Sequence, residues 1–138
     1  MPLVPQEVFL TRGVGRHRNR LQSFELALRK AGIERGNLVR VSSILPPRCC
    51  VVPRADGLAK LEPGVIPFCV LAEASTNEPS RLVSAGIGLA QPATGDQYGY
   101  ISAHHGFGMN EGRVGHMVED MAATMRAQKR LSMSEVSG

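Results

Sequence analysis

The chain has 138 residues, of which 43% are hydrophobic and 20% charged, and its formal net charge at pH 7 is +4. These values are typical of a globular protein and exclude a disordered or low-complexity chain. The first residues lack the apolar stretch of a secretion signal, and no segment reaches the roughly 20 apolar residues of a membrane-spanning helix. We therefore expect one cytoplasmic domain over residues 1–138.

Basic residues gather near both ends of the chain, where they could contact phosphate. The group near the start comprises Arg12, Arg16, His17, Arg18, Arg20, Arg29 and Lys30. No aromatic residues alternate with them, as binding of a single nucleic-acid strand would favour. A solvated surface or a contact within an oligomer is the favoured interpretation, and a nucleic-acid-binding module is a remote alternative.

The three cysteines are Cys49, Cys50 and Cys69. They form neither a CxxC pair nor a spaced Cys/His quartet. We therefore expect no metal site and no disulfide framework.

In the first half of the chain, the pattern predicts a strand at 7–11, a turn at the glycines of 13–15 and a helix over 19–31. The helix prediction rests on one apolar stripe at helical spacing, formed by Leu21, Phe24, Ala27, Leu28 and Ala31. Gly32 follows as a natural helix end. The β-branched segment 37–42 is typical of a strand.

In the second half, short strands are expected at 50–52, 64–71 and 97–105, and Pro67 places the second of them at a sheet edge or bulge. A helix is expected from a cap at Thr76 or Asn77 through Leu89, and another from Asn110 to about Gln128. Residues 131–138 are expected to fray. Strands interleaved with helices over this length favour a two-layer or sandwich α/β arrangement.

The dipeptide Ser42–Ser43 lies where the expected strand meets the prolines Pro46 and Pro47. In a constrained peptide, the Ser43 hydroxyl can attack the Ser42 carbonyl carbon. An acyl shift, an elimination and a hydrolysis then convert Ser43 into a pyruvoyl group. A side-chain amide such as that of Asn37 could donate to the oxyanion of this attack, although about 20 Å of extended strand would separate the two. A Ser-Ser dipeptide alone is a weak signal.

Six stretches carry a family resemblance, namely 23–28, 31–33, 37–47, 75–79, 98–102 and 104–108. The most specific is the Ser-Ser-x-x-Pro-Pro element of 42–47 with Asn37 upstream. Together they resemble pyruvoyl-dependent arginine decarboxylases over most of residues 7–125.

The resemblance implies an α/β (α+β) fold, an αββα-type sandwich, assembled as homotrimers or multiples of trimers with active sites between subunits. It implies autocatalytic cleavage into a β chain, 1–42, and an α chain, 43–138. The cofactor would be the covalent pyruvoyl group from Ser43, without metal or pyridoxal phosphate. Its keto carbon would form a Schiff base with L-arginine and serve as electron sink, giving agmatine and CO2. Agmatine could feed polyamine biosynthesis.

Individual residues match positions of the family. Ser43 matches the pyruvoyl precursor, Ser42 the carbonyl that is attacked, and Asn37 the residue that supports processing. Glu25 matches an acidic position that binds the substrate guanidinium, and Leu21 and Leu28 match pocket-lining positions. A carboxylate suits that role because it accepts two charge-assisted hydrogen bonds from a guanidinium.

Two features depart from the family. Its proton donor is a glutamate before a pair such as His-His, and here Ala103 precedes His104 and His105. Loss of a general acid typically costs about 10²–10⁴-fold in rate. On a strand His104 points to the opposite face, and His105 lies about 7 Å along from Ala103. Impaired turnover is therefore expected, and a catalytically silent homologue that binds arginine or agmatine is the alternative.

The second departure is the C-terminal segment 129–138. Family members usually continue there into further strand structure, which this segment does not suggest. A missing strand predicts an exposed sheet edge, or a gap that another subunit covers.

Overall fold

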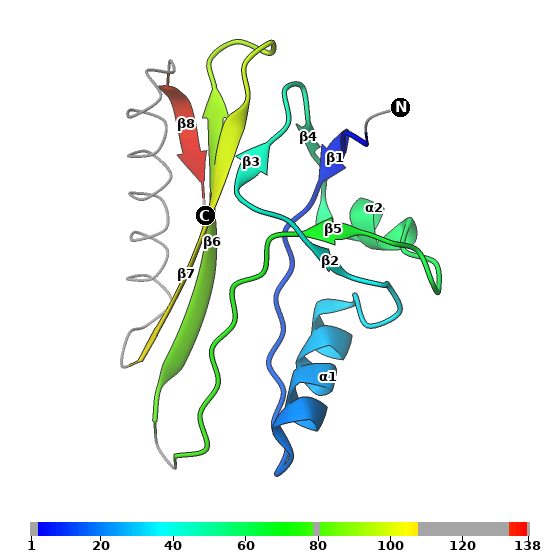
Figure 1. Ribbon diagram of the computed structural model, residues 1–138, viewed down its shortest axis with the longest axis vertical. Helices are drawn as coiled ribbons and strands as arrows, with labels where there is room; N and C mark the ends of the chain where they lie inside the picture. Colours follow the sequence, from blue (N-terminus) through cyan, green and yellow to red (C-terminus); the bar gives the residue numbers. More distant parts are fainter. Residues whose placement is uncertain (1–2, 79–80, 108–132, 138) are drawn as a thin grey trace. The chain divides into compact units, whose positions relative to one another are not determined.

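The computed structural model describes residues 3–78, 81–107 and 133–137, and the chain divides into two compact units. Unit 1 comprises Met1–Val39 and Cys49–Cys69, whereas unit 2 comprises Arg40–Arg48 and Val70–Gly138. Each unit is therefore built from two stretches of chain that are distant in sequence. Helices and strands both occur (Figure 1), which confirms the mixed α/β class expected from the sequence.

In unit 1, short strands pair across the sequence. β1 (Glu7–Val8) runs parallel to β4 (Cys50–Val51), and the Cys50 N–H donates to the Gln6 carbonyl over 2.9 Å. β2 (Val39–Arg40), whose first residue is the last of the stretch 1–39, pairs with β5 (Phe68–Cys69). These strands lie inside the segments predicted at 7–11, 37–42, 50–52 and 64–71, but each is shorter than predicted.

The predicted helix over 19–31 is confirmed as α1 (Arg20–Ala31). Asn19 is its N-cap, since the Asn19 Oδ1 atom accepts hydrogen bonds from the N–H groups of Leu21 and Gln22 over 2.9 and 3.2 Å. Gly32 ends the helix with φ 83°, a conformation that favours glycine.

The segment before α1 lies against the helix instead of forming the turn expected at 13–15. A Cβ atom on Gly13 would lie 2.1 Å from the Ala27 carbonyl oxygen, and one on Gly15 would lie 2.1 Å from the Ser23 carbonyl oxygen. No side chain fits at such distances. These glycines therefore allow the backbone of residues 13–15 to lie close to the backbone of α1. The turn predicted at 13–15 was wrong.

A second helix in unit 1, α2 (Arg54–Ala59), was not predicted. It begins after Pro53 and buries Gly57 against the ring of Phe9. Six residues that include a glycine are too short to form a helix without tertiary contacts, so no sequence signal was available.

Unit 2 contains a four-stranded antiparallel sheet in the order β3-β7-β6-β8, formed by Ile44–Leu45, Gly99–Phe107, Val83–Pro92 and Met133–Ser137. β6 and β7 form a long hairpin whose register runs from Val83 opposite Phe107 to Ala90 opposite Tyr100 (Figure 1). The buried residues of β3, β6 and β7 are Leu45, Gly88, Leu89, Ala90, Gly99, Tyr100, Ile101, Ser102 and Gly106.

β6 corrects the helix that was predicted from Thr76 to Leu89. Gly86 and Gly88 disfavour a helix, whereas Val83 and Ile87 are β-branched and suit a strand. Pairing with β7 on one side and β8 on the other decides the conformation. The strand predicted at 97–105 is confirmed as β7.

β8 corrects the expectation that residues 131–138 are frayed. It pairs with β6, with Ala90 opposite Val136 and a register irregularity between Gln91 and Pro92. The sheet edge expected to lie open is thus paired on this side. The helix predicted over 110–128 lies outside the described residues.

Candidate active site

The serine pair lies in unit 2, directly before β3. Ser42 is exposed and Ser43 is half-buried. The Ser43 carbonyl oxygen accepts a hydrogen bond from the Ile101 N–H group over 2.7 Å. Ser43 is therefore fixed to the central strand of the sheet while the preceding residue remains accessible to water.

Neither Ser42 nor Ser43 adopts the left-handed backbone conformation. Among the described residues other than glycine, it is occupied by Arg48, whose φ is 62°. The Ser42–Ser43 bond is also not a cis peptide. The constraint on Ser43 is thus the hydrogen bond to β7, not a strained φ angle.

The register places Ala103 near Ser43. Ile44 lies opposite Tyr100, so the same register continued by one residue places Ser43 opposite Ile101. Ala103 follows two residues later, about 7 Å along β7 and on the same face as Ile101. The predicted proton-donor position therefore lies on β7, and the predicted cofactor precursor directly precedes β3, the strand next to it.

Ala103 is exposed and pairs with Ile87 of β6. His104 is half-buried, and its Nε2 atom is buried without a hydrogen-bond partner among the described residues. His105 is exposed, and the two imidazole centroids are 6.3 Å apart. Solvent thus reaches position 103, where the alanine side chain itself has no acidic group.

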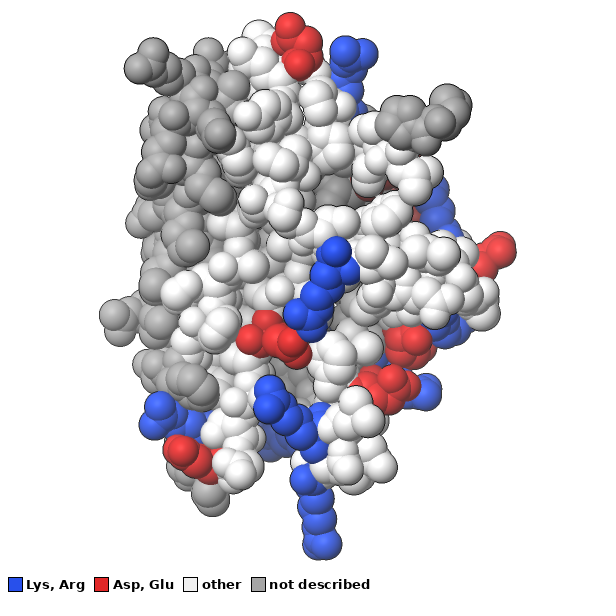
Figure 2. Space-filling view, viewed as in Figure 1, with Lys and Arg blue, Asp and Glu red and all other residues white. Residues whose placement is uncertain are grey.

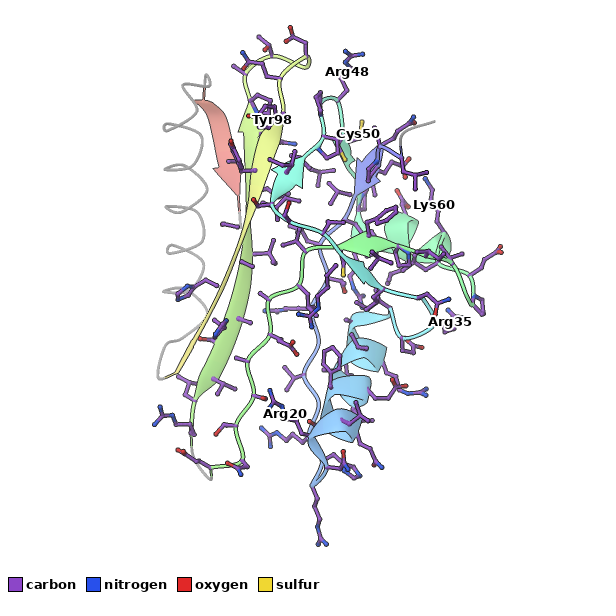
Figure 3. The ribbon with its side chains drawn as sticks, viewed as in Figure 1. Arg20, Arg35, Arg48, Cys50, Lys60 and Tyr98 are labelled. Carbon is purple, nitrogen blue, oxygen red and sulfur yellow. The ribbon has the colours of Figure 1, made fainter. Side chains whose placement is uncertain are left out.

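Tyr100 lies opposite Ile44, beside the serine pair, and is 4% exposed. Burial, and secondarily Tyr98, raise the pKa of its phenol above the ordinary value of 10.0. Tyr98, labelled in Figure 3, meets it edge to face with a centroid distance of 5.6 Å. Tyr100 therefore remains protonated and serves as an uncharged part of the core.

The predicted substrate-binding residues lie on α1 in unit 1. The Glu25 Oε1 atom is 3.1 Å from Nη2 of Arg29, one helical turn along. The Glu25 side chain is 47% exposed, so its carboxylate is accessible to a ligand. Glu25 thus pairs with a guanidinium within its own helix, and its binding of a substrate guanidinium stays a prediction.

The two leucines of the predicted pocket differ in exposure. Leu21 is 76% exposed, although the sequence placed it on the apolar stripe of the helix, and Leu28 is half-buried. Ala31 is the buried residue of that stripe. A single exposed leucine is common on protein surfaces, so the pocket-lining role of Leu21 stays a prediction.

Asn37 lies in unit 1, two residues before β2. Its backbone N–H donates to the Val65 carbonyl over 2.7 Å, and its side-chain Nδ2 donates to the Gly64 carbonyl over 3.2 Å. A primary amide nitrogen carries two hydrogens, so one bond to Gly64 leaves a second donor. Asn37, Glu25, Leu21 and Leu28 therefore belong to one unit, and Ser42, Ser43 and Ala103 to the other.

Among the described residues, no group of three or more His, Cys, Asp or Glu side chains is arranged to hold a metal ion. No helix in that part of the chain has the length and hydropathy of a membrane span. Among the described residues, acidic and basic side chains are interspersed on the face shown in Figure 2.

Comparison with known proteins identifies the family to which the chain belongs. The family model "Pyruvoyl-dependent arginine decarboxylase" matches residues 7–136. The chain belongs to the pyruvoyl-dependent arginine decarboxylase family.

Several members of this family are closely similar to the chain. Pyruvoyl-dependent arginine decarboxylase 2 of Methanosarcina mazei is 58% identical over 125 residues, which cover 91% of this chain and 68% of that protein. The probable pyruvoyl-dependent arginine decarboxylase of Chloroherpeton thalassium is 54% identical over 127 residues, 92% of this chain and 70% of that protein. The family predicted from the serine pair and its flanking stretches is thus confirmed.

Sequence reasoning missed two arginines close to the predicted site. Arg29, the partner of Glu25, was detectable from its i,i+4 spacing. Arg54, which contacts the end of α1, comes from a distant segment and left no sequence signal.

Proposed function

We propose that this member of the family cleaves itself between Ser42 and Ser43 and then decarboxylates L-arginine to agmatine and CO2. The observation that carries the proposal is the hydrogen bond from the Ile101 N–H to the Ser43 carbonyl. It anchors the cofactor precursor to the strand that bears the proton-donor position.

Self-processing needs a nucleophile, an oxyanion donor and water. The Ser43 Oγ atom attacks the Ser42 carbonyl carbon, the peptide C–N bond breaks, and an ester links the two residues. Elimination then releases the Ser42 carboxylate and leaves a dehydroalanine at position 43, whose hydrolysis releases ammonia and leaves a keto group. Water is needed for the last step at position 43, and Ser43 is only half-buried and follows the exposed Ser42, so water can reach it.

The residues around Ser43 fit a pyruvoyl group. The group supplies an electrophilic keto carbon that captures the substrate amino group and withdraws electrons when CO2 leaves. The carbonyl that would neighbour this keto carbon is the Ser43 carbonyl, which the Ile101 N–H already holds. The hydrogen bond from the Ile101 N–H positions this carbonyl without a charged side chain.

Asn37 supports the processing step in this proposal, and Glu25 binds the substrate. Because about 20 Å of extended strand would separate Asn37 from Ser42, the second amide hydrogen of Asn37 would reach the oxyanion at Ser42 only through a turn of the chain or from a neighbouring subunit. The Glu25 carboxylate would accept the substrate guanidinium, which already has a precedent in Arg29. Leu21 and Leu28 would contact the aliphatic part of arginine.

Alanine cannot donate a proton, so the substrate carbon would have to receive its proton from a group other than residue 103. Because Ala103 is exposed, water can reach this position on β7. We propose that solvent delivers the proton slowly, and that turnover is about 10²–10⁴-fold below that of a chain with an acid here.

Mass spectrometry under denaturing conditions tests the processing step. The expected masses are those of residues 1–42 and 43–138, the latter with a blocked N-terminus. Ser43→Ala is the control, because without the Oγ nucleophile the chain should stay whole. An intact wild-type chain after prolonged incubation would contradict self-processing.

Release of labelled CO2 from arginine tests the decarboxylation. The wild-type chain is expected to be slow and Ala103→Glu to be faster by about 10²-fold or more. A second candidate function, binding of arginine or agmatine without turnover, is favoured by Ala103 itself. It would be supported if the wild-type chain bound agmatine but released no CO2.

We further propose the αββα sandwich of the family for the assembled protein, as a homotrimer or a multiple of trimers, and a cytoplasmic location. Sedimentation equilibrium would determine the oligomeric state.

A further inference from the structure

The C-terminal end of α1 is completed by a residue from a distant part of the chain. A helix leaves its last four carbonyl groups without partners inside the helix. In α1 these belong to residues 28–31. The Leu28 carbonyl accepts from the Ile33 N–H and the Arg29 carbonyl from the Gly32 N–H, each over 3.1 Å. The local chain thus satisfies two of the four.

Arg54 and Thr11 satisfy the other two. Arg54 Nη2 donates to the Lys30 carbonyl over 3.2 Å and to the Ala31 carbonyl over 3.3 Å. The Thr11 hydroxyl donates to the Ala31 carbonyl over 2.7 Å. Arg54 Nε in turn donates to the Thr11 Oγ1 atom over 2.9 Å. The guanidinium therefore joins the start of α2, the segment before α1 and the end of α1 in one network within unit 1.

The positive charge of Arg54 also stabilises the end of α1 at which its side chain lies. The C-terminal end of a helix carries partial negative charge, which a cation near the last turn stabilises. A guanidinium is planar and presents several N–H donors in a fixed geometry, so it can bond three acceptors at once. Lysine has a single nitrogen and would reproduce only part of this network.

Cleavage between residues 42 and 43 gives Arg54 a particular importance. α1 and Thr11 would belong to the fragment 1–42, and Arg54 to the fragment 43–138. We infer that Arg54 is a positioning residue that fixes the substrate-binding helix α1 to the other fragment after cleavage. This inference rests on the proposed function, because α1 carries Glu25, the proposed guanidinium ligand.

Hydrogen exchange tests the anchor without requiring activity. We expect Arg54→Ala to accelerate amide exchange about 2- to 10-fold in the last turn of α1, the equivalent of one net hydrogen bond, in the cleaved protein and in the uncleaved Ser43→Ala protein. Arg54→Lys should restore part of the protection. Unchanged exchange in Arg54→Ala would overturn the anchor even if arginine turnover were normal.

Kinetics test the positioning of Glu25. In the background of Ala103→Glu, Arg54→Ala should raise KM for arginine about 2- to 10-fold and change kcat less than twofold, with partial rescue by Arg54→Lys. The matched control is Lys60→Ala (Lys60 is labelled in Figure 3), which removes an exposed ion pair with Glu7 that also joins the two fragments but does not touch α1. Its KM should stay at the parent value.

The results of these experiments distinguish a failure of the Arg54 proposal from a failure of the proposed function. Accelerated exchange without any decarboxylation in the parent protein would refute the proposed function and leave the anchor standing. Accelerated exchange with an unchanged KM, or an equal rise of KM in Lys60→Ala, would overturn the positioning role.

Discussion

Removal of Arg29 should improve the binding of arginine. The Arg29 guanidinium lies 3.1 Å from the Glu25 carboxylate, the group that we propose binds the substrate guanidinium. The substrate must therefore displace Arg29 or share the carboxylate with it. In Arg29→Ala this competition is absent, and alanine preserves the helix because its helical propensity is high.

The expected magnitude follows from the exposure of the pair. Side chains that are 60% and 47% exposed are largely screened by water. Such an i,i+4 ion pair contributes about 0.3–0.5 kcal/mol, although Coulomb's law in bulk water gives about 1.3 kcal/mol at this separation. We therefore expect KM for arginine to fall roughly twofold, the factor that corresponds to about 0.4 kcal/mol.

The assay is steady-state CO2 release at two ionic strengths. At low salt the difference between Arg29→Ala and wild type should be largest, and it should shrink above about 0.1 M salt, where the Debye length is about 10 Å. Lys30→Ala is the control, since it removes the same charge from a position about 100° around the helix. A KM that stays constant or rises in Arg29→Ala, or that falls equally in Lys30→Ala, would refute the role assigned to Glu25.

Three further outcomes follow from the structure. Asn37→Ala should slow self-cleavage by about 10²-fold, the effect of one oxyanion donor, and a wild-type rate on a time course of denaturing gels would contradict that role. Gly15→Ala should lower the free energy of unfolding by about 1–3 kcal/mol in urea titrations, because the new Cβ would meet the Ser23 carbonyl; equal midpoints would show that the segment 13–15 can move away from α1. Burial, reinforced by Cys50 and Glu7, raises the pKa of Cys49 above its usual 9.0, so its protonated thiol stabilises the fold fully below pH 9 and progressively less as pH rises above it. Thermal unfolding midpoints should therefore fall more steeply above pH 9 in the wild type than in Cys49→Ala, and parallel profiles would refute this.

Local signals predicted the helix α1 and the strand β7 correctly. In α1 the apolar spacing and Gly32 act within a few residues of each other, so the sequence contains the information. β6 was wrongly predicted as a helix because its conformation depends on two partner strands. β8 was missed for the same reason, since a short strand gains its stability from the strand beside it.

The site shows the same division between local and distant effects. The family was predicted from six stretches between residues 23 and 108, among which the serine pair with Pro46 and Pro47 was the most specific, because the residues of such a motif are neighbours in the sequence. The hydrogen bond from Ile101 to Ser43 and the contacts of Arg54 depend on residues far apart in sequence, which no local pattern reveals. Even so, the i,i+4 spacing of Glu25 and Arg29 would have predicted their ion pair.

The division of the chain between two interleaved units has a consequence for the order of maturation. β1 pairs with β4 from beyond the serine pair, so unit 1 can form only while both stretches are present. The bond between Ser42 and Ser43, which we propose is cleaved, lies in a nine-residue stretch, Arg40–Arg48, that links one part of unit 1 to the other. A chain cut before it folds would have to bring its two pieces together from solution. If the chain cleaves itself as we propose, we therefore expect folding to precede cleavage, and the uncut chain would be a precursor that is activated after it has folded.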